Sequence, residues 1–536
     1  MPGLIKPLVW SVSSPILARQ WVRILNELVG DTHIHAKRLV KAFHYHAYFN
    51  MGQFGRVFAS LGMPRDSLER MMGMLPPGVS RPKFMPGISF LPKAPRVIRF
   101  VLDKMRFGSR AEREYPIFQK EARTFSGPLD ADDSPSDLLE RVDQIVRLQE
   151  KISYNTILSI LLMQIYNALL RRYLIARGVD PSQFDLTDQW ERLQAFDPNL
   201  QLADLHNRYQ ALEPQLQVRL SQGDLQALHQ EAGLSDFRKH FDQFLDRFGH
   251  LSDSTVDFTS IPWRESPDLI LRLVSEFTPR ETKQVNKISL QDLKCSRLSF
   301  RYLCFIYQRA RQFRLYREMY SSQYTYTLML LRDHFHALGA RLTVEGLLSS
   351  WQDIFFLYLE ELRKWVNGDA DGKDFATLVA KRKDEMERSR NALIPDVIYG
   401  DAIPPLIPAN ANKLQGIPTS RGYYAGRIKV VHGLNDFQKL EQGDVLVIPY
   451  SDVGWTPLFA RAGAVIAESG GILSHSSIIA REYNIPAVVS VKAAMNLPDG
   501  ALVEVDGYKG LVYLKDSSEP TSAGERGAIY ANSASR

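Results

Sequence analysis

His475 is the residue of this 536-residue chain whose surroundings best suit chemistry. It lies in the run GGILSHSSIIAREYNIPAVV, residues 470–489, after a strand-like apolar stretch and at the start of a predicted helix. Imidazole has an unperturbed pKa of about 6.5, so most of it is neutral in the cytoplasm and attacks phosphorus without first losing a proton. The run therefore predicts a histidine that carries a phosphoryl group.

The neighbours of His475 are residue types that accommodate a phosphate. Gly470 and Gly471 permit backbone conformations closed to other residues and leave room for the group. Free N–H groups at a helix start, together with the helix dipole, favour an anion. Ser474 and Ser476 add hydroxyl donors or caps. We expect these four residues to bind the phosphate.

Two simpler interpretations compete with this one. An isolated histidine at a helix start is usually a core or capping residue, but here the glycine pair, the aliphatic pair and Ala-Arg are all in register with His475, which favours function. For Arg481 the question stays open, because its side chain could screen the phosphate charge or lie on a solvated helix face.

The same run resembles the phosphorylation-site pattern of the phosphohistidine (swivelling) domain of phosphoenolpyruvate synthase, pyruvate phosphate dikinase and rifampicin phosphotransferase. Leu473 stands where the synthase pattern has a hydroxyl residue, and Ser474 directly precedes the histidine, which looks more like the rifampicin-phosphotransferase branch. The stretch PYSDVGWTPLFARAGAVIAESGG is also similar to the family, which places such a loop beside the histidine. Trp455 and Thr456 could then touch the phosphate or a docked partner, with ordinary packing as the alternative for the tryptophan.

Short apolar runs punctuated by glycine surround His475 and predict a small α/β domain. Two helices are expected to cover its sheet, over 456–461 and 476–483. The predicted strands are 427–431, 444–448, 464–467, 487–491, 502–505 and 511–513.

The rest of the chain is predicted to be mostly α-helical, because apolar residues recur at the helical period from about residue 136 to about residue 387. The longest amphipathic segments are 138–174, 237–248, 298–338 and 353–365. The fold class is therefore multidomain, with a large helical domain followed by a small swivelling domain. The predicted divisions are a helical, substrate-binding-like domain (1–394), a proline-rich hinge linker (395–413), a phosphohistidine swivelling domain (414–515) and a polar tail predicted to be disordered (516–536).

The helical region resembles the middle domain of rifampicin-phosphotransferase-like proteins, which in that family binds the phosphate acceptor. The likeness lies in PGLIKPLVWSV, AYFNMGQFGRVFASLG, FGHLSDSTVDFTSIPWRESPDLIL, DIFFLYLEEL and an arginine-rich helix around Arg314. Within this region His250 is a candidate general base towards an acceptor hydroxyl, with Arg264 or Arg314 neutralising phosphate charge. A purely structural, hydrogen-bonded His250 is an equal alternative.

Composition narrows the class of protein. Net charge is +6 with a pI near 9.0, but basic residues are dispersed among nearly as many acidic ones, which argues against nucleic-acid binding. Two cysteines provide neither a disulfide framework nor a cysteine metal site, and the histidine pairs do not have metal-ligand spacing, so we expect no metal. The sequence shows neither a signal peptide nor a membrane span, so we expect a cytoplasmic protein without a membrane partner.

The expected function follows from two observations. His475 is predicted to carry a phosphoryl group, and residues 1–400 contain no glycine-rich phosphate cradle. We expect a phosphotransferase subunit in which a separate ATP-grasp protein, holding ATP and Mg²⁺, phosphorylates His475 and the group passes to a small-molecule acceptor in the helical domain. The family resemblance implies AMP and phosphate as products. Two alternatives stay open, a non-catalytic binding or regulatory protein that retains the fold and a phosphoenolpyruvate-dependent relay protein.

Overall fold

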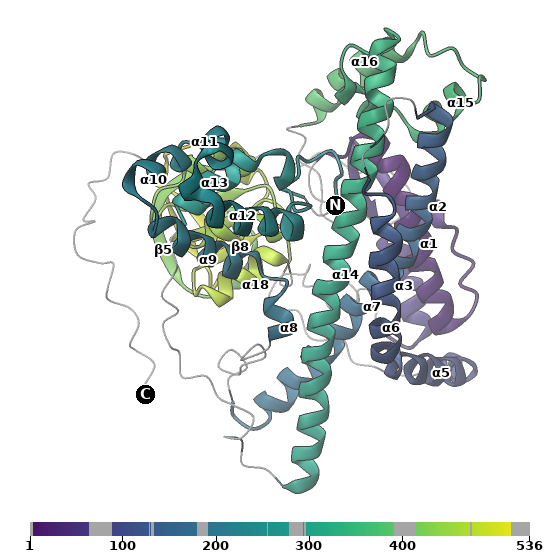
Figure 1. Cartoon of the computed structure of the whole chain (residues 1–536). Helices are drawn as coiled ribbons and strands as arrows, with labels where there is room; N and C mark the ends of the chain where they lie inside the picture. The colour runs from purple at the N-terminus through teal and green to yellow at the C-terminus, as the bar shows by residue number, and fades with distance from the viewer. Residues whose placement is uncertain are drawn as a thin grey trace.

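The molecule has two lobes, a long helical bundle and a second lobe in which a small sheet is covered by short helices (Figure 1). The computed structural model describes residues 4–63, 88–127, 129, 133–179, 191–254, 256–277, 293, 296–390, 413–471 and 474–515. The predicted hinge linker, apart from the backbone of its last residue, and the predicted disordered tail lie outside these residues, so both stay predictions.

The N-terminal part contains a β-hairpin in a region predicted to be helical. Two short strands pair antiparallel, with Val40 opposite Phe49 and Phe43 opposite His46. The two residues of the turn, His44 and Tyr45, both have positive φ (49° and 60°), which is the geometry of a two-residue primed turn. The usual Asn-Gly signal for such a turn is missing, which is why the pattern did not reveal it. The elements are α1 (Pro7–Val29), α2 (Ala36–Leu39), β1 (Val40–Phe43), β2 (His46–Phe49) and α3 (Met51–Ser60).

The bundle is built on two long antiparallel helices, α7 and α14, which pack on each other and on α1 and α6. At the start of α7, Ser134 and Asp137 form a capping box. The segment predicted as one helix over 353–365 is instead two elements, because Glu361 accepts a hydrogen bond from the backbone of Tyr358 and starts a new helix there. The elements are α5 (Ala94–Met105), α6 (Phe107–Arg123), α7 (Pro135–Ile175), α14 (Arg297–Val344), η6 (Trp351–Phe356), α15 (Leu359–Val366) and α16 (Phe375–Ser389).

Short helices between α7 and α14 cover the sheet of the second lobe (Figure 1). Several begin with a side-chain cap or with proline in the first turn, as at Asp197 and Asp224. They are α8 (Glu191–Gln194), α9 (Pro198–Gln210), α10 (Pro214–Ser221), α11 (Leu225–Gln230), α12 (Ser235–Phe248) and α13 (Pro267–Ser275).

The C-terminal domain is an eight-stranded mixed sheet of order β3-β10-β9-β5-β6-β7-β8-β4. Its centre is parallel, from β5 to β8, and the three fully buried strands β6, β7 and β8 explain the continuous apolar runs of the sequence. The α/β fold class is confirmed. The strands are β3 (Lys413–Gln415), β4 (Ile417–Ser420), β5 (Tyr423–Val430), β6 (Val445–Ile448), β7 (Ala464–Ala467), β8 (Ala487–Val489), β9 (Leu502–Asp506) and β10 (Leu511–Leu514), with helices α17 (Thr456–Phe459) and α18 (His475–Glu482).

Elements that are distant in the chain share a hydrophobic core in the second lobe. One face of the sheet, with Val447 and Ile466, has a core of its own. The other face shares a core with α9 to α13, which joins Phe248 and Trp263 to Leu446 and Trp455. Helices from the middle of the sequence therefore pack with the C-terminal domain.

Within the part of the chain that the structure describes, every helix is either too short or too polar to cross a bilayer.

Candidate active site

The start of α18 holds His475 among serine hydroxyls. Ser474 is the N-cap, and its side chain accepts from the backbone N–H of Ser477. The same Oγ lies 2.9 Å from the hydroxyls of Ser476 and Ser477. Ser474 and Ser477 also donate to the carbonyl of Gly471, at 2.8 and 2.7 Å. The serines thus fix the loop that leads into the histidine.

Gly470 is needed for its backbone conformation. Its φ is +147°, a region that side-chain-bearing residues rarely adopt. A Cβ there would lie 3.1 Å from Ser474 Oγ and 3.3 Å from Val489 Cβ, and Ser490 Oγ donates to the Gly470 carbonyl at 2.6 Å. The glycine therefore lets β7 turn tightly towards α18.

The imidazole of His475 is held by Thr456, the first residue of α17. The Nε2 atom of His475 lies 2.8 Å from Thr456 Oγ1. The single hydroxyl proton of Thr456 is donated to the Val453 carbonyl at 2.6 Å, so Oγ1 accepts from Nε2–H. The ring is then the Nε2–H tautomer, and its free lone pair is on Nδ1. For Nε2 to become the nucleophile, the contact with Thr456 has to change.

Burial and two arginines keep this imidazole neutral. Removal from water lowers the pKa of His475 to about 3, and Arg317 and then Arg314 add to the effect. Both arginines lie on α14, three residues apart and so on neighbouring positions of one helix face. Arg314 is paired with Glu482 at 2.7 Å and Arg317 with Glu318 at 2.5 Å. A neutral nucleophile next to two cations suits a group that gains negative charge when phosphorylated.

Arg481 lies on the last turn of α18. Its Nε donates to the Ser477 carbonyl at 2.7 Å, and burial followed by Arg171 acts to lower its pKa, against the opposing effect of Glu482. The positive charges that act on His475 come from α14 instead. Of the residues named from sequence, the structure brings Gly470, Gly471, Ser474, Ser476 and Arg314 around His475 and leaves Arg481 further along the helix.

The two other acceptor-side candidates lie in the segment between α12 and α13. His250 is buried, with Nε2 at 3.1 Å from Ser322 Oγ on α14, and burial followed by Arg264 lowers its pKa to about 4. Arg264 forms an ion pair with Asp333. The space beside His250 measures about 10 Å³, room for one water. An acceptor hydroxyl could reach His250 only if this segment opened.

The same segment connects the two lobes. Phe258 stacks on Phe335 of α14 with centroids 5.4 Å apart, and Arg332 pairs with Glu265 through two contacts of 2.8 and 2.9 Å. Asp253 faces the other way, towards the sheet domain. Its carboxylate accepts from the backbone N–H of Leu434 at 3.3 Å.

Trp455 completes this docking contact. Its indole N–H donates to the Asp253 carbonyl at 2.9 Å, and its side chain is fully buried. The loop before α17 therefore serves twice, because Trp455 docks the domain and Thr456 holds the histidine. Sequence patterns did not single out Arg317 or Asp253 as site residues. Both act across the lobes, so the polar run around His250 and the arginine-rich helix around Arg314, in which they lie, did not by themselves indicate these contacts.

We expect the low pKa of His475 to show in the pH dependence of stability. The folded-state pKa lies below the unfolded value, so the unfolded chain binds more protons as pH falls below about 6.5, and the free energy of unfolding decreases from there towards about pH 3. Denaturant unfolding at several pH values should give a shallower decrease for His475→Gln than for the wild type. A ¹⁵N NMR titration that shows His475 protonating near pH 6.5 would contradict the assignment.

Removing the Thr456 hydroxyl should change the tautomer of His475. Thr456→Val leaves Nε2–H without an acceptor, at a cost of about 1–3 kcal/mol in the free energy of unfolding. Imidazole ¹⁵N shifts report the tautomer directly, and Thr456→Ser is the control that keeps the hydroxyl. An unchanged tautomer in the valine variant would show that another group holds the ring.

Two known families match parts of the chain. Residues 440–510, which contain His475, Thr456 and the buried strands, match the family described as PEP-utilising enzyme, mobile domain. Residues 153–318, from the middle of α7 to Arg317 and Glu318 on α14, match the rifampicin phosphotransferase fourth domain.

Among curated proteins, the chain is 30% identical over 323 residues to rifampicin phosphotransferase of Bacillus cereus, which covers 54% of this chain and 36% of the relative. It is 28% identical over 319 residues to that of Bacillus subtilis, with the same shares, and 31% identical over 278 residues to an uncharacterized protein of Mycobacterium tuberculosis, covering 50% of this chain and 30% of that one. The chain thus spans about a third of the length of these relatives. Residues 440–510 and the middle helices are thus similar to parts of PEP-utilising enzymes, and rifampicin phosphotransferases are among the relatives that the chain resembles.

Proposed function

We propose that this chain is the phosphocarrier and acceptor-binding part of a phosphotransferase. An ATP-grasp protein, a separate partner that holds ATP and Mg²⁺, phosphorylates His475, and the mobile domain delivers the group to the hydroxyl of a small molecule bound in the helical bundle. The observation that carries the proposal is the neutral imidazole of His475, held at a helix start between Thr456 and the arginines of α14.

The reaction balances as two displacements and one hydrolysis. A ring nitrogen of His475 attacks the β-phosphorus of ATP, AMP leaves with the electrons of the broken P–O bond, and the γ-phosphate passes to water. The acceptor oxygen then attacks the phosphohistidine, the P–N bond breaks, and the imidazole is regenerated as the hydroxyl proton leaves to a base. Arg317 and Arg314 lower the cost of the charge on the phosphohistidine. The hydroxyls of Ser474 and Ser476 can donate to the phosphate once they exchange their bonds to the Gly471 carbonyl and to each other.

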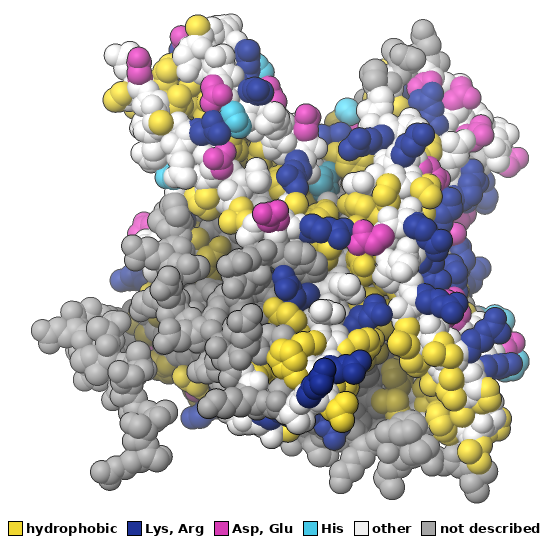
Figure 2. Space-filling view, turned by 60° about the horizontal axis from the view of Figure 1, so that its bottom comes forward, with side chains coloured by type: hydrophobic (Ala, Val, Ile, Leu, Met, Phe, Trp, Pro, Cys, Tyr) yellow, Lys and Arg dark blue, Asp and Glu magenta, His cyan; other side chains and the backbone are white. Residues whose placement is uncertain are grey.

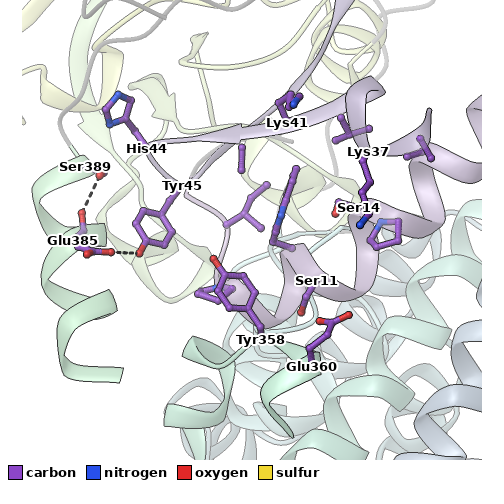
Figure 3. Close-up of a pocket in the computed structure, with 18 of the residues that line it drawn as sticks. Ser11, Ser14, Lys37, Lys41, His44, Tyr45, Tyr358, Glu360, Glu385 and Ser389 are labelled. Carbon is purple, nitrogen blue, oxygen red and sulfur yellow. Dashed lines mark hydrogen bonds between the residues drawn. The ribbon is translucent and has the colours of Figure 1, made fainter. Parts of the chain in front are cut away.

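The acceptor site that best fits this scheme is a cavity of about 1050 Å³ in the bundle (Figure 3). Its volume is that of a site for a drug-sized molecule, whereas the space at His250 holds one water. Residues far apart in the sequence line it, which is why no sequence pattern indicated it. The walls come from α1, the β1–β2 hairpin, the start of α15 and the end of α16, with Trp10, Pro15, Ala18, Val40, Tyr45 and Tyr358 as apolar or aromatic surface.

Polar residues line several walls of the cavity, and Glu385 on α16 is one of its two carboxylates, with Glu360 as the other. Tyr45 donates its hydroxyl to Glu385 Oε2 at 2.6 Å, and burial followed by this bond raises the pKa of Tyr45 (Figure 3). The second carboxylate oxygen, Oε1, lies 3.9 Å from Lys381 Nζ and keeps lone pairs that can accept from an acceptor hydroxyl, so Glu385 is the general base of the scheme.

The first test is labelling of His475. We expect ATP labelled in the β-phosphate, together with an ATP-grasp protein, to give acid-labile, base-stable label on the wild type and none on His475→Ala. Absence of label with every ATP-grasp candidate would overturn the proposal. Label from phosphoenolpyruvate and an upstream carrier instead of ATP would make the chain a relay protein.

The second test concerns the cavity. Glu385→Gln keeps the shape but removes the base, so transfer from phosphorylated His475 to a hydroxyl-bearing acceptor such as a rifamycin should slow by about 100-fold. Labelling of His475 itself should be unchanged. Tyr45→Phe is the milder variant, and Glu360→Gln, at another wall of the cavity, is the matched control. Equal transfer rates in the wild type and Glu385→Gln would exclude Glu385 as the base.

A further inference from the structure

The lower halves of α7 and α14 form a two-helix projection below both lobes (Figure 1). We call residues 160–177 and 297–317 the stalk. Its helices are held together by a small core of their own, composed of Leu170, Leu174, Leu303, Ile306 and Ala310. The stalk is therefore an ordered surface.

The charge of the stalk is of one sign. Residues 160–177 contain three arginines and residues 297–317 contain six, and neither segment contains an acidic residue. This differs from the chain as a whole, where 66 basic residues face 60 acidic ones. Such a surface attracts a partner that carries negative charge.

The stalk also exposes apolar side chains on one face. Leu298, Tyr302 and Phe305 are four and three residues apart, so they share a side of α14, and they are 79%, 49% and 40% exposed. On α7, Ile175 is 49% exposed. In Figure 2, which turns the lower end of the molecule forward, basic and hydrophobic side chains lie next to one another near the centre of the lower half. Exposed apolar and aromatic residues with arginine are the composition of a protein interface.

The upper end of the stalk is the arginine pair at His475. Arg301 and Arg317 are on the same helix, about 24 Å apart at 1.5 Å per residue. A protein bound along this length reaches the histidine, and phosphoryl transfer requires its donor to come within van der Waals contact of the ring. Because the stalk leads to His475, the protein that delivers the phosphoryl group to this histidine is the partner that fits this surface best.

We infer that the stalk is the docking surface for the ATP-grasp protein, whose contacting face is acidic around an apolar centre. The inference rests on the proposed function and adds where the donor binds. Aliphatic residues such as Leu298 and Ile175 favour a protein over a nucleic acid, which would be bound through arginine and aromatic rings alone.

The test compares a stalk variant with a control of equal charge change. Arg297→Glu with Arg301→Glu reverses two exposed stalk charges, and Lys239→Glu with Arg247→Glu reverses two exposed charges on α12. The measurement is the rate of His475 labelling as the concentration of the ATP-grasp protein is varied. We expect the stalk variant to require about tenfold more of the partner, the control to match the wild type, and added salt to weaken the wild type more than the stalk variant. Leu298→Asp should act like the stalk variant.

Phosphoramidate separates docking from reactivity, because this small donor phosphorylates histidine without a protein. It should label the wild type and the stalk variant at equal rates. Equal dependence on the ATP-grasp protein in both would overturn the inference while leaving the proposed function intact. No ATP-dependent label on the wild type would overturn both. Loss, in the stalk variant alone, of binding to single-stranded RNA or to vesicles with anionic lipid, with labelling unchanged, would assign the stalk to that partner instead.

Discussion

The structure of this site depends on keeping one imidazole uncharged next to two guanidinium groups. Burial and the arginines act in the same direction, and the hydrogen bond from Nε2–H to Thr456 gives the neutral ring a defined tautomer. A charged ring would be repelled by α14, whereas a phosphorylated ring would be attracted to it. The same pair of arginines can therefore tolerate the free histidine and favour the phosphorylated one, which is the difference that the proposed carrier role requires.

The segment from Gly249 to Glu265 connects the helical bundle to the domain that carries His475. Phe258 and Glu265 attach it to the bundle, and Asp253 attaches it to the mobile domain through Leu434 and Trp455. Burial raises the pKa of Asp253 to about 6, with Asp436 acting in the same direction, so its charge state is sensitive to conditions near neutrality. Few polar contacts hold the docked position, while a shared apolar core provides the area.

The hydrophobic pattern of the sequence predicted those helices and strands whose structure depends mainly on their own residues. The buried strands β6, β7 and β8 appear as apolar runs between glycines, and α7, α12 and α14 follow the helical period closely. It failed at the β1–β2 hairpin, whose turn uses His44 and Tyr45 at positive φ without a glycine. It also failed at residues 353–365, where a second cap at Tyr358 divides one amphipathic stretch into two helices. In both places a contact or a backbone state outweighs the periodicity.

By itself the sequence indicated His475 as the candidate nucleophile, with the glycine and serine residues beside it, because that pattern lies within some twenty consecutive residues. The α/β domain that presents His475 was indicated by the apolar runs around this motif. Only the tertiary structure decided the rest. Arg317 acts on His475 from another helix, His250 is closed off against Ser322, and the large cavity forms where α1, a hairpin and α16 meet. These are relations between residues distant in the chain, and packing rather than local composition brings such residues together.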